Sequence, residues 1–577
     1  MLDHGIIPGL IQIKRMCPGT WCTGGAYPPQ KMAAHYSDMT HIAPTAVTAG
    51  PPLGALIAAL RDAARYPHPV QRIDVLETHI SWVILTGRYA YKIKKPVNLG
   101  FLDFSSLEAR RHYCEEELRL NRRLAPSLYE TVVRITGSAD NPAIEGGGPA
   151  IEYAVRMREF PQSALASRLL ADGQLTSAHI DALAQRIAAF HADTGVAARG
   201  SPYGAAEAVI TAARENFTHL ERLLPDAAEH ARIAELRAWT ERECNARLTR
   251  FVERQAQGCV RECHGDLHLG NIMLLDGQLT PFDCIEFNPA LRWIDTMSEV
   301  AFLVVDLLDR GRTDFAWRFL NAYLEAGDGH AGLDVLRFYL VYRALVRAKV
   351  HGLRAAQDGV SAAECARLRG ASRGYIELAL RCAHGARPAI ILTHGLSGSG
   401  KSVIAQALAE QIGAIRLRSD IERKRASGLA PLTRSGATLA AGIYSEDRTR
   451  ATYNQLLDLA RRAAHAGYPA LVDATFLQRW QRDLFRREAN AQHIPFVIVD
   501  VSAPESVMRA RIAARLAAGS DASEADQAVL TRQLAQNETL TSDESSSVLR
   551  CDTSCADVVA IVREVCAALP RHPVPLR

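Results

Sequence analysis

The sequence lacks the features of a membrane-spanning, secreted or metal-cluster protein. No stretch approaches the ~20 consecutive apolar residues of a membrane span, and the first residues carry no continuous apolar core of a signal peptide. The 12 cysteines among 577 residues form no CxxC pair. Free thiols in a reducing compartment are therefore a better interpretation than zinc sites or disulfides. These absences favour a cytoplasmic location.

A strong excess of either charge is also lacking. The net charge is +4 over 577 residues, which indicates no obligate polyanionic partner. The basic stretch 416–425 nevertheless keeps nucleic acid open as a partner for one part of the chain. We expect no membrane association, and no obligate protein partner is evident.

The pattern of the sequence changes twice along the chain. Residues 1–50 are rich in Gly, Pro, Thr and Ala without a sustained period, so we expect a poorly ordered extension. Residues 75–160 are strand-rich with one helical stretch, which predicts a mixed sheet, and helical spacing dominates from 174. We expect an α+β domain at 51–385 and an α/β domain with a parallel sheet at 386–577.

The stretch GLSGSGKS is the stricter of two phosphate-handling motifs. It matches the Walker A pattern GxxxxGKS, with the apolar run IILTH before it and an amphipathic helical stretch after it. In such a loop, backbone N–H groups bind phosphate, the lysine reaches the β and γ phosphates, and the hydroxyl ligates magnesium. The predicted ATP-binding residues are Gly395, Leu396, Ser397, Gly398, Ser399, Gly400, Lys401 and Ser402, with Ser402 also a magnesium ligand.

Two carboxylates downstream extend this site. Asp420 follows a predicted second strand, where it can accept the proton of an acceptor hydroxyl, although a helix-capping role stays open and one residue can do both. Asp473 ends the apolar run PALVD, and ligands gather at the carboxyl ends of strands in open α/β sheets. We predict Asp420 and Lys401 as catalytic residues and Asp473 as a magnesium carboxylate.

This part of the chain resembles small P-loop kinases of the polynucleotide 5′-kinase and zeta-toxin type. In those kinases a serine–aspartate pair and an arginine follow the second strand, and here they match Ser419, Asp420 and Arg425. The resemblance also implies that Arg511 and Arg515, four apart on one helix face, neutralise the transferring phosphoryl group. A solvated basic face is the alternative for the latter pair.

The second motif, HGDLHLGN, reproduces the spacing HRDxxxxN of a kinase catalytic loop, with Gly265 in place of arginine. Asp266 would hold and deprotonate the acceptor hydroxyl. Asn271 and the downstream Asp283 would ligate magnesium, which prefers hard oxygen ligands.

A lysine for the phosphates lies upstream in RYAYKIK. Lys92 stands two residues after Ala90, as in the kinase strand VAIK, and Lys94 is the alternative on the same strand face. Lys92 would contact the α and β phosphates and pair with a carboxylate of the following helix. The sequence has no GxGxxG loop between its first two predicted strands, which argues against a protein kinase.

These motifs resemble the aminoglycoside phosphotransferase and choline-kinase branch of the kinase-like fold, over about residues 75–380. Alignment with that family's Glu-x-x-Leu-Leu pattern selects Glu117 as the ATP-site carboxylate, with Glu115 and Glu116 as rivals. The resemblance also implies that His268 lies beside the base and that Asp295 braces the C-terminal lobe.

The order of the two parts resembles bacterial bifunctional aminoglycoside phosphotransferase/ATP-binding proteins. It implies a two-lobed, protein-kinase-like α+β domain followed by a P-loop NTPase domain. We expect an ATP- and Mg²⁺-dependent kinase with two nucleotide sites and a hydroxyl-bearing small-molecule acceptor. In one alternative the P-loop part phosphorylates a polynucleotide 5′-hydroxyl or a nucleotide sugar; in another, the chain is a regulatory ATP-binding or ATPase module without a soluble acceptor. An aminoglycoside pocket would be acidic, and the sequence does not locate one.

Overall fold

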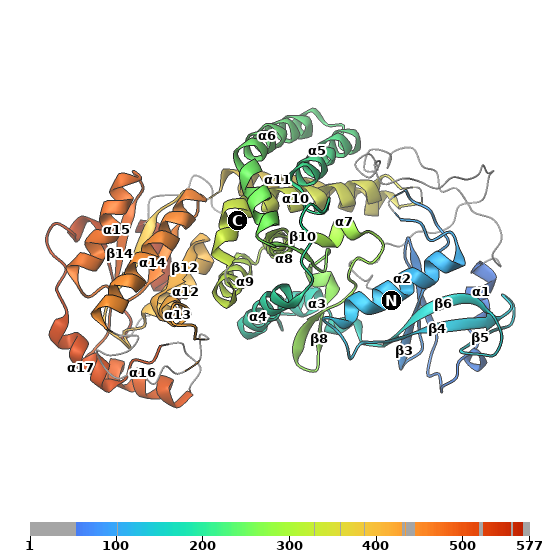
Figure 1. The fold of residues 1–577 in the computed structure, drawn as a ribbon, viewed down its shortest axis with the longest axis horizontal. Helices are drawn as coiled ribbons and strands as arrows, with labels where there is room; N and C mark the ends of the chain where they lie inside the picture. Colours follow the sequence, from blue (N-terminus) through green and yellow to red (C-terminus); the bar gives the residue numbers. More distant parts are fainter. Residues whose placement is uncertain are drawn as a thin grey trace. The chain divides into compact units, whose positions relative to one another are not determined.

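The computed structural model describes residues 53–568 except 101, 328, 358, 386, 430–432, 434–444, 519–522 and 555–557. The extension expected at 1–50 lies outside the described residues. The chain forms two compact units (Figure 1). The first comprises residues up to Arg186 with Phe190–Asp306 and Phe338–Leu380, and the second comprises Ile187–Ala189, Leu307–Arg337 and the chain from Arg381. None of the helices in the described ranges is long and apolar enough to cross a membrane.

The first unit begins with a six-stranded sheet. Its order is β1 (Asp74–Glu77), β2 (Ser81–Leu85), β3 (Tyr89–Lys94), β6 (Ala150–Arg158), β4 (Tyr129–Gly137) and β5 (Pro142–Ile144). Neighbouring strands of this sheet all pair antiparallel, so the predicted mixed sheet was wrong. The reason is that β6 lies between β3 and β4, so the helical connection from β3 to β4 creates no parallel neighbours.

The two faces of this sheet follow from alternation along β3. Tyr91 and Ile93 pack on one face with helix α1 (Leu53–Ala59). Lys92 and Lys94 point to the opposite face, because side chains of a strand alternate with period two. Helix α2 (Leu107–Arg122) lies on that face, and its N-cap Ser106 hydroxyl accepts the Ala109 N–H at 3.0 Å. The lysines are therefore aimed at a helix that carries carboxylates.

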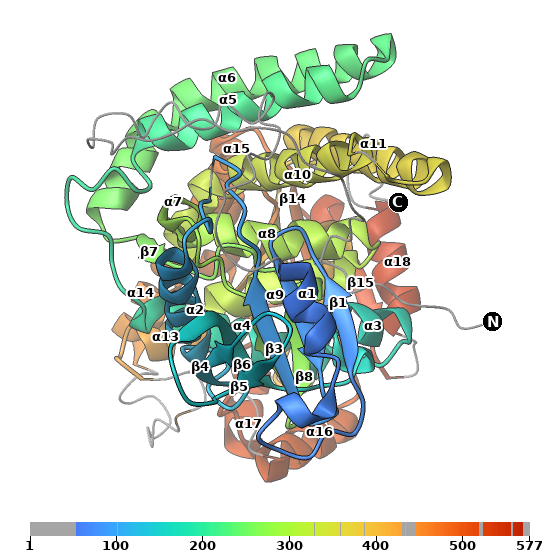
Figure 2. The same cartoon turned by 90° about the vertical axis from the view of Figure 1, so that its right-hand side faces the viewer.

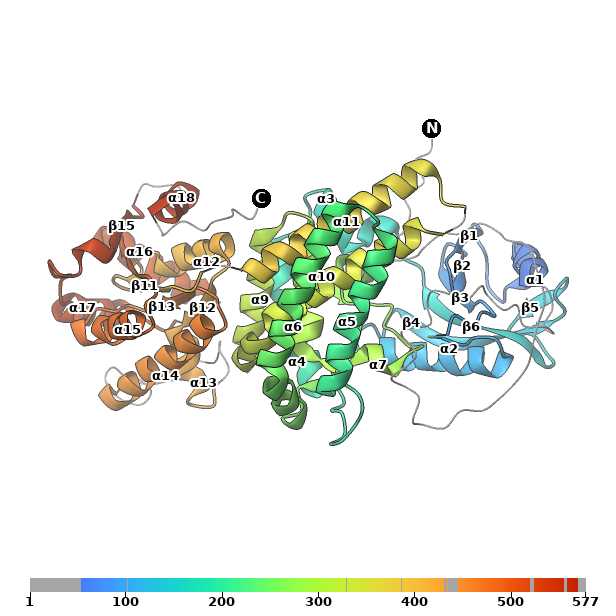
Figure 3. The same ribbon diagram turned by 90° about the horizontal axis from the view of Figure 1, so that it is seen from above.

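Helices and two small sheets make up the rest of the first unit. Figures 2 and 3 show α5 and α6 running side by side, with α10 and α11 in neighbouring layers. The helices are α3 (Ala166–Ala171), α4 (Ser177–Asp193), α5 (Ala206–Leu223), α6 (Ala227–Ala256), α7 (Pro289–Arg292), α8 (Thr296–Asp309), α10 (Leu333–Ala355) and α11 (Ala362–His384). The two-stranded sheets are β7 (Val260–Glu262) with β10 (Trp293–Asp295) and β8 (Ile272–Leu275) with β9 (Gln278–Pro281).

The second unit contains a five-stranded parallel sheet, as predicted from its apolar runs. Its order is β12 (Ile415–Arg418), β13 (Ala470–Asp473), β11 (Ile390–His394), β14 (Phe496–Ser502) and β15 (Val548–Asp552). The helices are α12 (Lys401–Ile412), α13 (Ser419–Arg425), α14 (Glu446–His465), α15 (Arg479–Ala491), α16 (Glu505–Ala518), α17 (Gln527–Gln536) and α18 (Val558–Ala568). β11 is the first strand of this sheet in the chain but lies at its centre. The chain connections therefore diverge at the carboxyl end of β11, which is where ligands bind in open parallel sheets.

Helix α9 (Thr313–Ala326) belongs to the second unit although it precedes the predicted boundary near 385. It lies at the edge strand β12, where Asn321 donates to the Ala414 carbonyl at 3.0 Å. Asn321 also accepts the Arg416 backbone N–H at 2.8 Å. The Asn321 side-chain amide thus bonds to a backbone carbonyl and a backbone N–H at this edge, the groups with which a further β-strand would otherwise pair.

Candidate active sites

Glycine is required in the loop that joins β11 to α12. Gly395 and Gly398 have φ values of 137° and 82°, in the region that favours glycine. A Cβ atom at Gly395 would lie 2.2 Å from the Val501 carbonyl oxygen, and one at Gly398 would lie 2.6 Å from the Met508 carbonyl oxygen. The loop therefore lies so close to neighbouring backbone that its shape depends on these residues.

Lys401 is the first residue of α12, and its Nζ donates to the Leu396 carbonyl at 2.6 Å. Burial lowers the pKa of Lys401 to about 8, and the attraction of Asp473 and Asp420 offsets burial only in part. Lys401 thus donates its hydrogen bond to a neutral carbonyl group of the loop, and a bound phosphate would provide a negative charge that stabilises the protonated amine.

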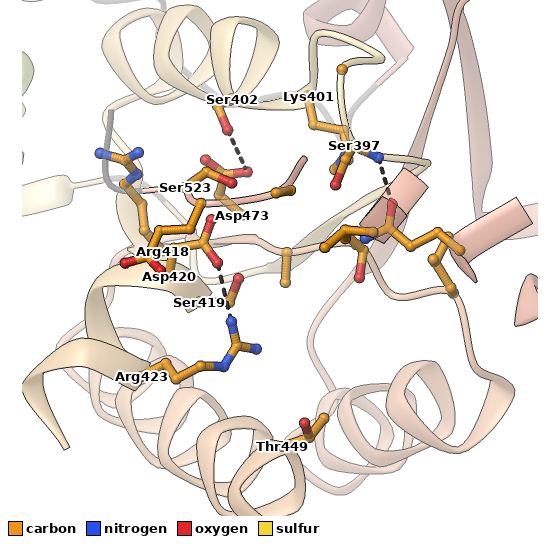
Figure 4. Close-up of a pocket in the computed structure, with 18 of the residues that line it drawn as sticks. Ser397, Lys401, Ser402, Arg418, Ser419, Asp420, Arg423, Thr449, Asp473 and Ser523 are labelled. Carbon is orange, nitrogen blue, oxygen red and sulfur yellow. Dashed lines mark hydrogen bonds and ion pairs between the residues drawn. The ribbon is translucent and has the colours of Figure 1, made fainter. Parts of the chain in front are cut away.

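Asp473 lies at the end of β13 and accepts a hydrogen bond from Ser402 Oγ at 3.3 Å (Figure 4). Its other oxygen accepts from Arg416 Nη2 at 2.6 Å. Burial raises the pKa of Asp473, but the charges of Arg416 and Arg418 outweigh burial and hold it below its usual range. The carboxylate is therefore ionised beside the serine hydroxyl, which is a suitable oxygen pair for a hard cation.

A pocket of about 1390 Å³ connects these groups with Asp420. Asp420 lies in the first turn of α13, whose N-cap position is Arg418. Its Oδ1 accepts from Arg423 Nη1 at 3.1 Å (Figure 4). The predicted residues that line the pocket are Ser397, Gly398, Gly400, Lys401, Ser402, Ser419, Asp420, Asp473, Arg511 and Arg515. The residues predicted to bind phosphate and the carboxylate predicted to bind the acceptor thus face one space.

Several hydrogen-bonding groups at this pocket already have protein partners. Arg511 donates to the Thr553 hydroxyl at 2.9 Å and to its carbonyl at 2.8 Å. Arg515 donates to the Ala525 carbonyl at 2.7 Å. The Ser397 N–H donates to Gln533 Oε1 at 2.8 Å, from helix α17. A phosphate that bound these donors would have to displace their present protein acceptors.

The basic stretch 416–425 is paired with acidic residues. Arg416 pairs with Asp473, Arg423 with Asp420, Lys424 with Glu524 at 3.1 Å, Arg425 with Glu422, and Arg418 lies 3.7 Å from Glu325 of α9. Arg425 also donates to the Glu325 carbonyl at 2.9 Å, so it contacts the end of α9. Sequence alone shows these charges but not their partners, and it therefore missed the role of Arg416 beside Asp473.

The first unit places Lys92 between two carboxylates. Lys92 Nζ lies 2.7 Å from Glu117 Oε1 and 2.6 Å from Asp283 Oδ1. Lys94 Nζ lies 2.8 Å from the second oxygen of Glu117 and also pairs with Glu286. The resulting chain of alternating charges is Asp283, Lys92, Glu117, Lys94 and Glu286, and all of them except the partly exposed Asp283 are buried. Glu286, three residues after Asp283 in the chain, had no predicted role.

Glu117 differs from its two rivals in position. Its side chain is 0% exposed, whereas Glu115 pairs with Arg111 and Glu116 with Arg119 on the helix surface. Burial would raise the pKa of Glu117, but the two lysines outweigh it and lower the pKa to about 2. Glu117 is therefore the α2 carboxylate that the structure brings to Lys92.

The HGDLHLGN loop brings Asp266 and Asn271 together. Asn271 Nδ2 donates to Asp266 Oδ2 at 3.0 Å, and His268 Nε2 lies 3.4 Å from the same oxygen. Burial opposes ionisation, but His268 and Arg347 outweigh it and hold the pKa of Asp266 below its usual range. The Asp266 side chain is 34% exposed, so an ionised carboxylate is accessible there.

The β8–β9 hairpin explains why Asn271 and Asp283 are neighbours although twelve positions separate them. The Phe282 N–H donates to the Asn271 carbonyl at 2.9 Å, one step beyond the pair Ile272–Pro281. Asp283 has φ 64°, a conformation that L-residues adopt rarely and that often marks functional sites. The residues predicted to ligate magnesium thus lie at the open end of one hairpin.

Buried contacts fix the backbone of this loop. Glu299 accepts the Gly265 N–H at 2.7 Å and lies 2.7 Å from His191 Nε2. Asp295 accepts two hydrogen bonds from Arg254, at 2.6 and 2.7 Å. Glu299 comes from α8 and His191 from α4, so the loop is held by elements distant in sequence, whereas the Arg254–Asp295 pair joins α6 to β10.

The comparisons with known proteins cover both parts of the chain. A family model described as an AAA domain matches residues 390–540. "Uncharacterized protein Rv2004c" of Mycobacterium tuberculosis and "Uncharacterized protein Mb2027c" of Mycobacterium bovis are each 32% identical over 458 residues, which is 79% of this chain and 89% of the relative. An alignment of 458 residues is longer than either part predicted from the sequence, so it includes portions of both.

Two solved structures are also similar. An amicoumacin kinase has a TM-score of 0.35 at 14% identity, covering 56% of this chain and 92% of that chain. A sugar kinase from Janibacter sp. has a TM-score of 0.25 at 20% identity, covering 32% of this chain and 94% of that chain.

Proposed function

We propose that this chain, which belongs to the family of the mycobacterial proteins Rv2004c and Mb2027c, is an ATP-dependent phosphotransferase with two nucleotide sites. The observation that carries the proposal is the pocket of the second unit, because Lys401 and Asp420 both line it. A phosphate-binding loop and a carboxylate that can bind a hydroxyl face the same space, which is the arrangement that phosphoryl transfer to an alcohol needs.

In the second unit, the loop N–H groups and Lys401 bind the phosphates of ATP. Asp420 accepts a hydrogen bond from the acceptor hydroxyl and orients its oxygen toward the γ-phosphorus. The new O–P bond forms as the bond to ADP breaks, and the hydroxyl proton passes to Asp420 or to water. The oxygens of Ser402 and Asp473 fit Mg²⁺, which would neutralise charge on the phosphates.

In the first unit, Asp266 has the corresponding role. Its lowered pKa keeps it anionic across the physiological range, so it orients the acceptor hydroxyl chiefly as a hydrogen-bond acceptor. Lys92 would bind the α and β phosphates after exchanging its contact with Asp283. Asn271 and Asp283 supply the oxygens that suit Mg²⁺.

A small-molecule acceptor is favoured over a nucleic-acid end for the second unit. A polyanion is bound mainly through cationic side chains that can exchange counterions for phosphates. The cations of 416–425 instead pair with carboxylates such as Asp473, Asp420 and Glu524. This stretch therefore lends little support to a polynucleotide 5′-kinase.

The test is transfer of labelled γ-phosphate to a cell metabolite extract by the wild type, Asp266→Ala and Lys401→Ala. Asp458→Ala, an exposed change in α14, is the matched control. We expect each site variant to lose a labelled product that the control retains, by about 100-fold or more. Loss of different products would indicate two independent kinases, and loss of the same product one coupled reaction. If neither variant loses a product, the proposal is wrong.

A further inference from the structure

The pocket of the second unit is large enough for an acceptor beside the nucleotide. Its volume of about 1390 Å³ exceeds the roughly 300–1,000 Å³ of a typical site for one small ligand. Part of its lining comes from α13, from α14 and from the segment 475–481 at the start of α15. This part contains Asp420, the carboxylate predicted to bind the acceptor, and is called the acceptor wall. Its chemistry therefore indicates which acceptors the pocket suits.

The charged residues of the acceptor wall lie beside opposite charges. They are Asp420, Arg423 and Glu446. Arg423 Nη1 lies 3.1 Å from Asp420 Oδ1, and Glu446 lies 3.8 Å from Arg450, one turn further along α14. The cations of the phosphate-binding loop and of α16 would instead face the phosphates of ATP under the proposed function. A charged acceptor would therefore meet no unpaired opposite charge among the described residues of this wall, and removing its charge from water would be unfavourable.

Two glutamines of the acceptor wall have amide N–H groups to offer a ligand. Gln478 Oε1 accepts the Trp480 indole N–H at 2.7 Å, and Gln481 Oε1 accepts the Gln478 backbone N–H at 3.2 Å. Both donors require an oxygen, so these contacts decide which end of each amide is the carbonyl. The Nε2 groups that remain have no hydrogen-bond acceptor in the described part of the chain. Each can donate two hydrogen bonds to a ligand.

Two hydroxyl groups add to these donors. Figure 4 shows Ser419 and Thr449 with Asp420 around the same space. Neither hydroxyl has a hydrogen-bond partner among the described residues, and a hydroxyl group can both donate and accept. Asp420 gives only Oδ1 to Arg423, so its Oδ2 can accept from a ligand. The acceptor wall thus offers uncharged polar groups, one carboxylate oxygen and the apolar surface of Leu477.

We propose that the acceptor phosphorylated in the second unit is an uncharged polyhydroxylated compound, of the sugar or polyol class. One hydroxyl donates to Asp420 Oδ2; its oxygen bonds to the γ-phosphorus as the bond to ADP breaks, and its proton passes to Asp420 or to water. The other hydroxyls accept from the glutamine amides and exchange hydrogen bonds with Thr449. A compound rich in hydroxyls matches these groups because each hydroxyl donates and accepts without bringing a charge. This inference rests on the proposed function of the second unit.

The first test uses Asp266→Ala protein, so that transfer depends on the second unit, with Asp266→Ala/Lys401→Ala as the blank. A metabolite extract is divided on charcoal, which retains nucleotides and nucleosides, and then on anion and cation exchangers. We expect Lys401-dependent labelling in the fraction that none of them retains. Labelling confined to a retained fraction overturns the inference but leaves the proposed function standing. Labelling in no fraction overturns the proposed function of this site, and the inference with it.

Periodate treatment of the unretained fraction, quenched before the reaction, tests for several hydroxyls. Periodate cleaves the C–C bond between neighbouring hydroxyl groups, so it should abolish the labelled product. A product that survives the treatment would show an acceptor without neighbouring hydroxyls and would overturn the polyhydroxylated class.

The second test changes Thr449 and reads KM separately from kcat for the purified acceptor. Thr449→Val keeps the shape of the side chain without its hydroxyl, so the KM for the acceptor should rise about three- to tenfold, with the KM for ATP within about twofold. Thr449→Ser should recover most of the affinity. Thr452→Val, which removes a hydroxyl bonded within α14 at 2.8 Å, should behave as the parent protein. Equal changes in both KM values, or no change in either, would overturn the inference.

Discussion

Lys92 in the first unit and Lys401 in the second lie in opposite electrostatic surroundings. Lys92 contacts two carboxylates, at 2.7 and 2.6 Å, and they outweigh burial and raise its pKa well above the ordinary value. Lys401 contacts a carbonyl at 2.6 Å, and burial lowers its pKa to about 8. Carboxylates thus keep Lys92 charged in the free protein, whereas Lys401 would be fully charged only beside a bound phosphate. Under the proposed function, phosphate binding relies on fixed counter-charges in the first unit and on the geometry of the loop in the second.

The largest expected contrast is in stability. Lys92→Met leaves Glu117 and Asp283 without a shared cation, and removing one partner of a buried ion pair is unfavourable by roughly 3–5 kcal/mol. Lys401→Met removes a buried cation that pairs with a neutral group, so the second unit should keep or gain stability. Hydrogen exchange followed by mass spectrometry, read over β3 and over α12, measures each unit separately. Equal loss of protection in both variants would remove the contrast.

The next contrast is in pH dependence, measured without metal ions. Between pH 7 and 9 the Lys401 amine of the free protein loses its charge. A bound phosphate favours the charged amine, so at pH 9 phosphate binding requires uptake of a proton. Nucleotide affinity of the second unit should fall about tenfold at pH 9, and that of the first unit should not change through Lys92. Competitive acetylation of the free protein reads the titration directly. A Lys401 amine that stays unreactive up to pH 10 would contradict the assignment.

The smallest expected effect concerns helix α17. Gln533→Ala frees the Ser397 N–H from its 2.8 Å contact and makes it available to phosphate. We expect nucleotide to bind the second unit about 2–5-fold more tightly, the range of one hydrogen bond near 0.5–1 kcal/mol. Calorimetric titration on an Asp283→Asn background, which removes a proposed metal ligand of the nucleotide in the first unit, measures it, with Gln536→Ala, the pocket neighbour on the same helix, as the control. An unchanged or weaker affinity would show that the contact does not compete with phosphate.

Short motifs were predictable because their chemistry depends on spacing within a few residues. The Walker A loop and the Asp266–Asn271 pair are local in this sense. Glu117 was instead selected through the family resemblance, and only the structure separates it from Glu115 and Glu116. The roles of these residues in catalysis stay predictions until the variants above are measured.

Features that depend on distant partners were not predictable. Periodicity identified the strands of the first unit but not that β6 lies between β3 and β4, so the sheet was called mixed. The basic stretch 416–425 looked like a surface for polyanions because its carboxylate partners, such as Glu325 and Glu524, are remote in sequence.

The position of Asn321 has a consequence for the second unit in isolation. An uncovered edge strand presents unpaired N–H and C=O groups on which another chain can form a strand, and this leads to self-association. Asn321 occupies such groups at Ala414 and Arg416 of the β12 edge. A fragment beginning near residue 386 would lose this cover. We therefore expect it to aggregate, and any dissection of the chain should carry the helix 313–326 with the phosphate-binding loop.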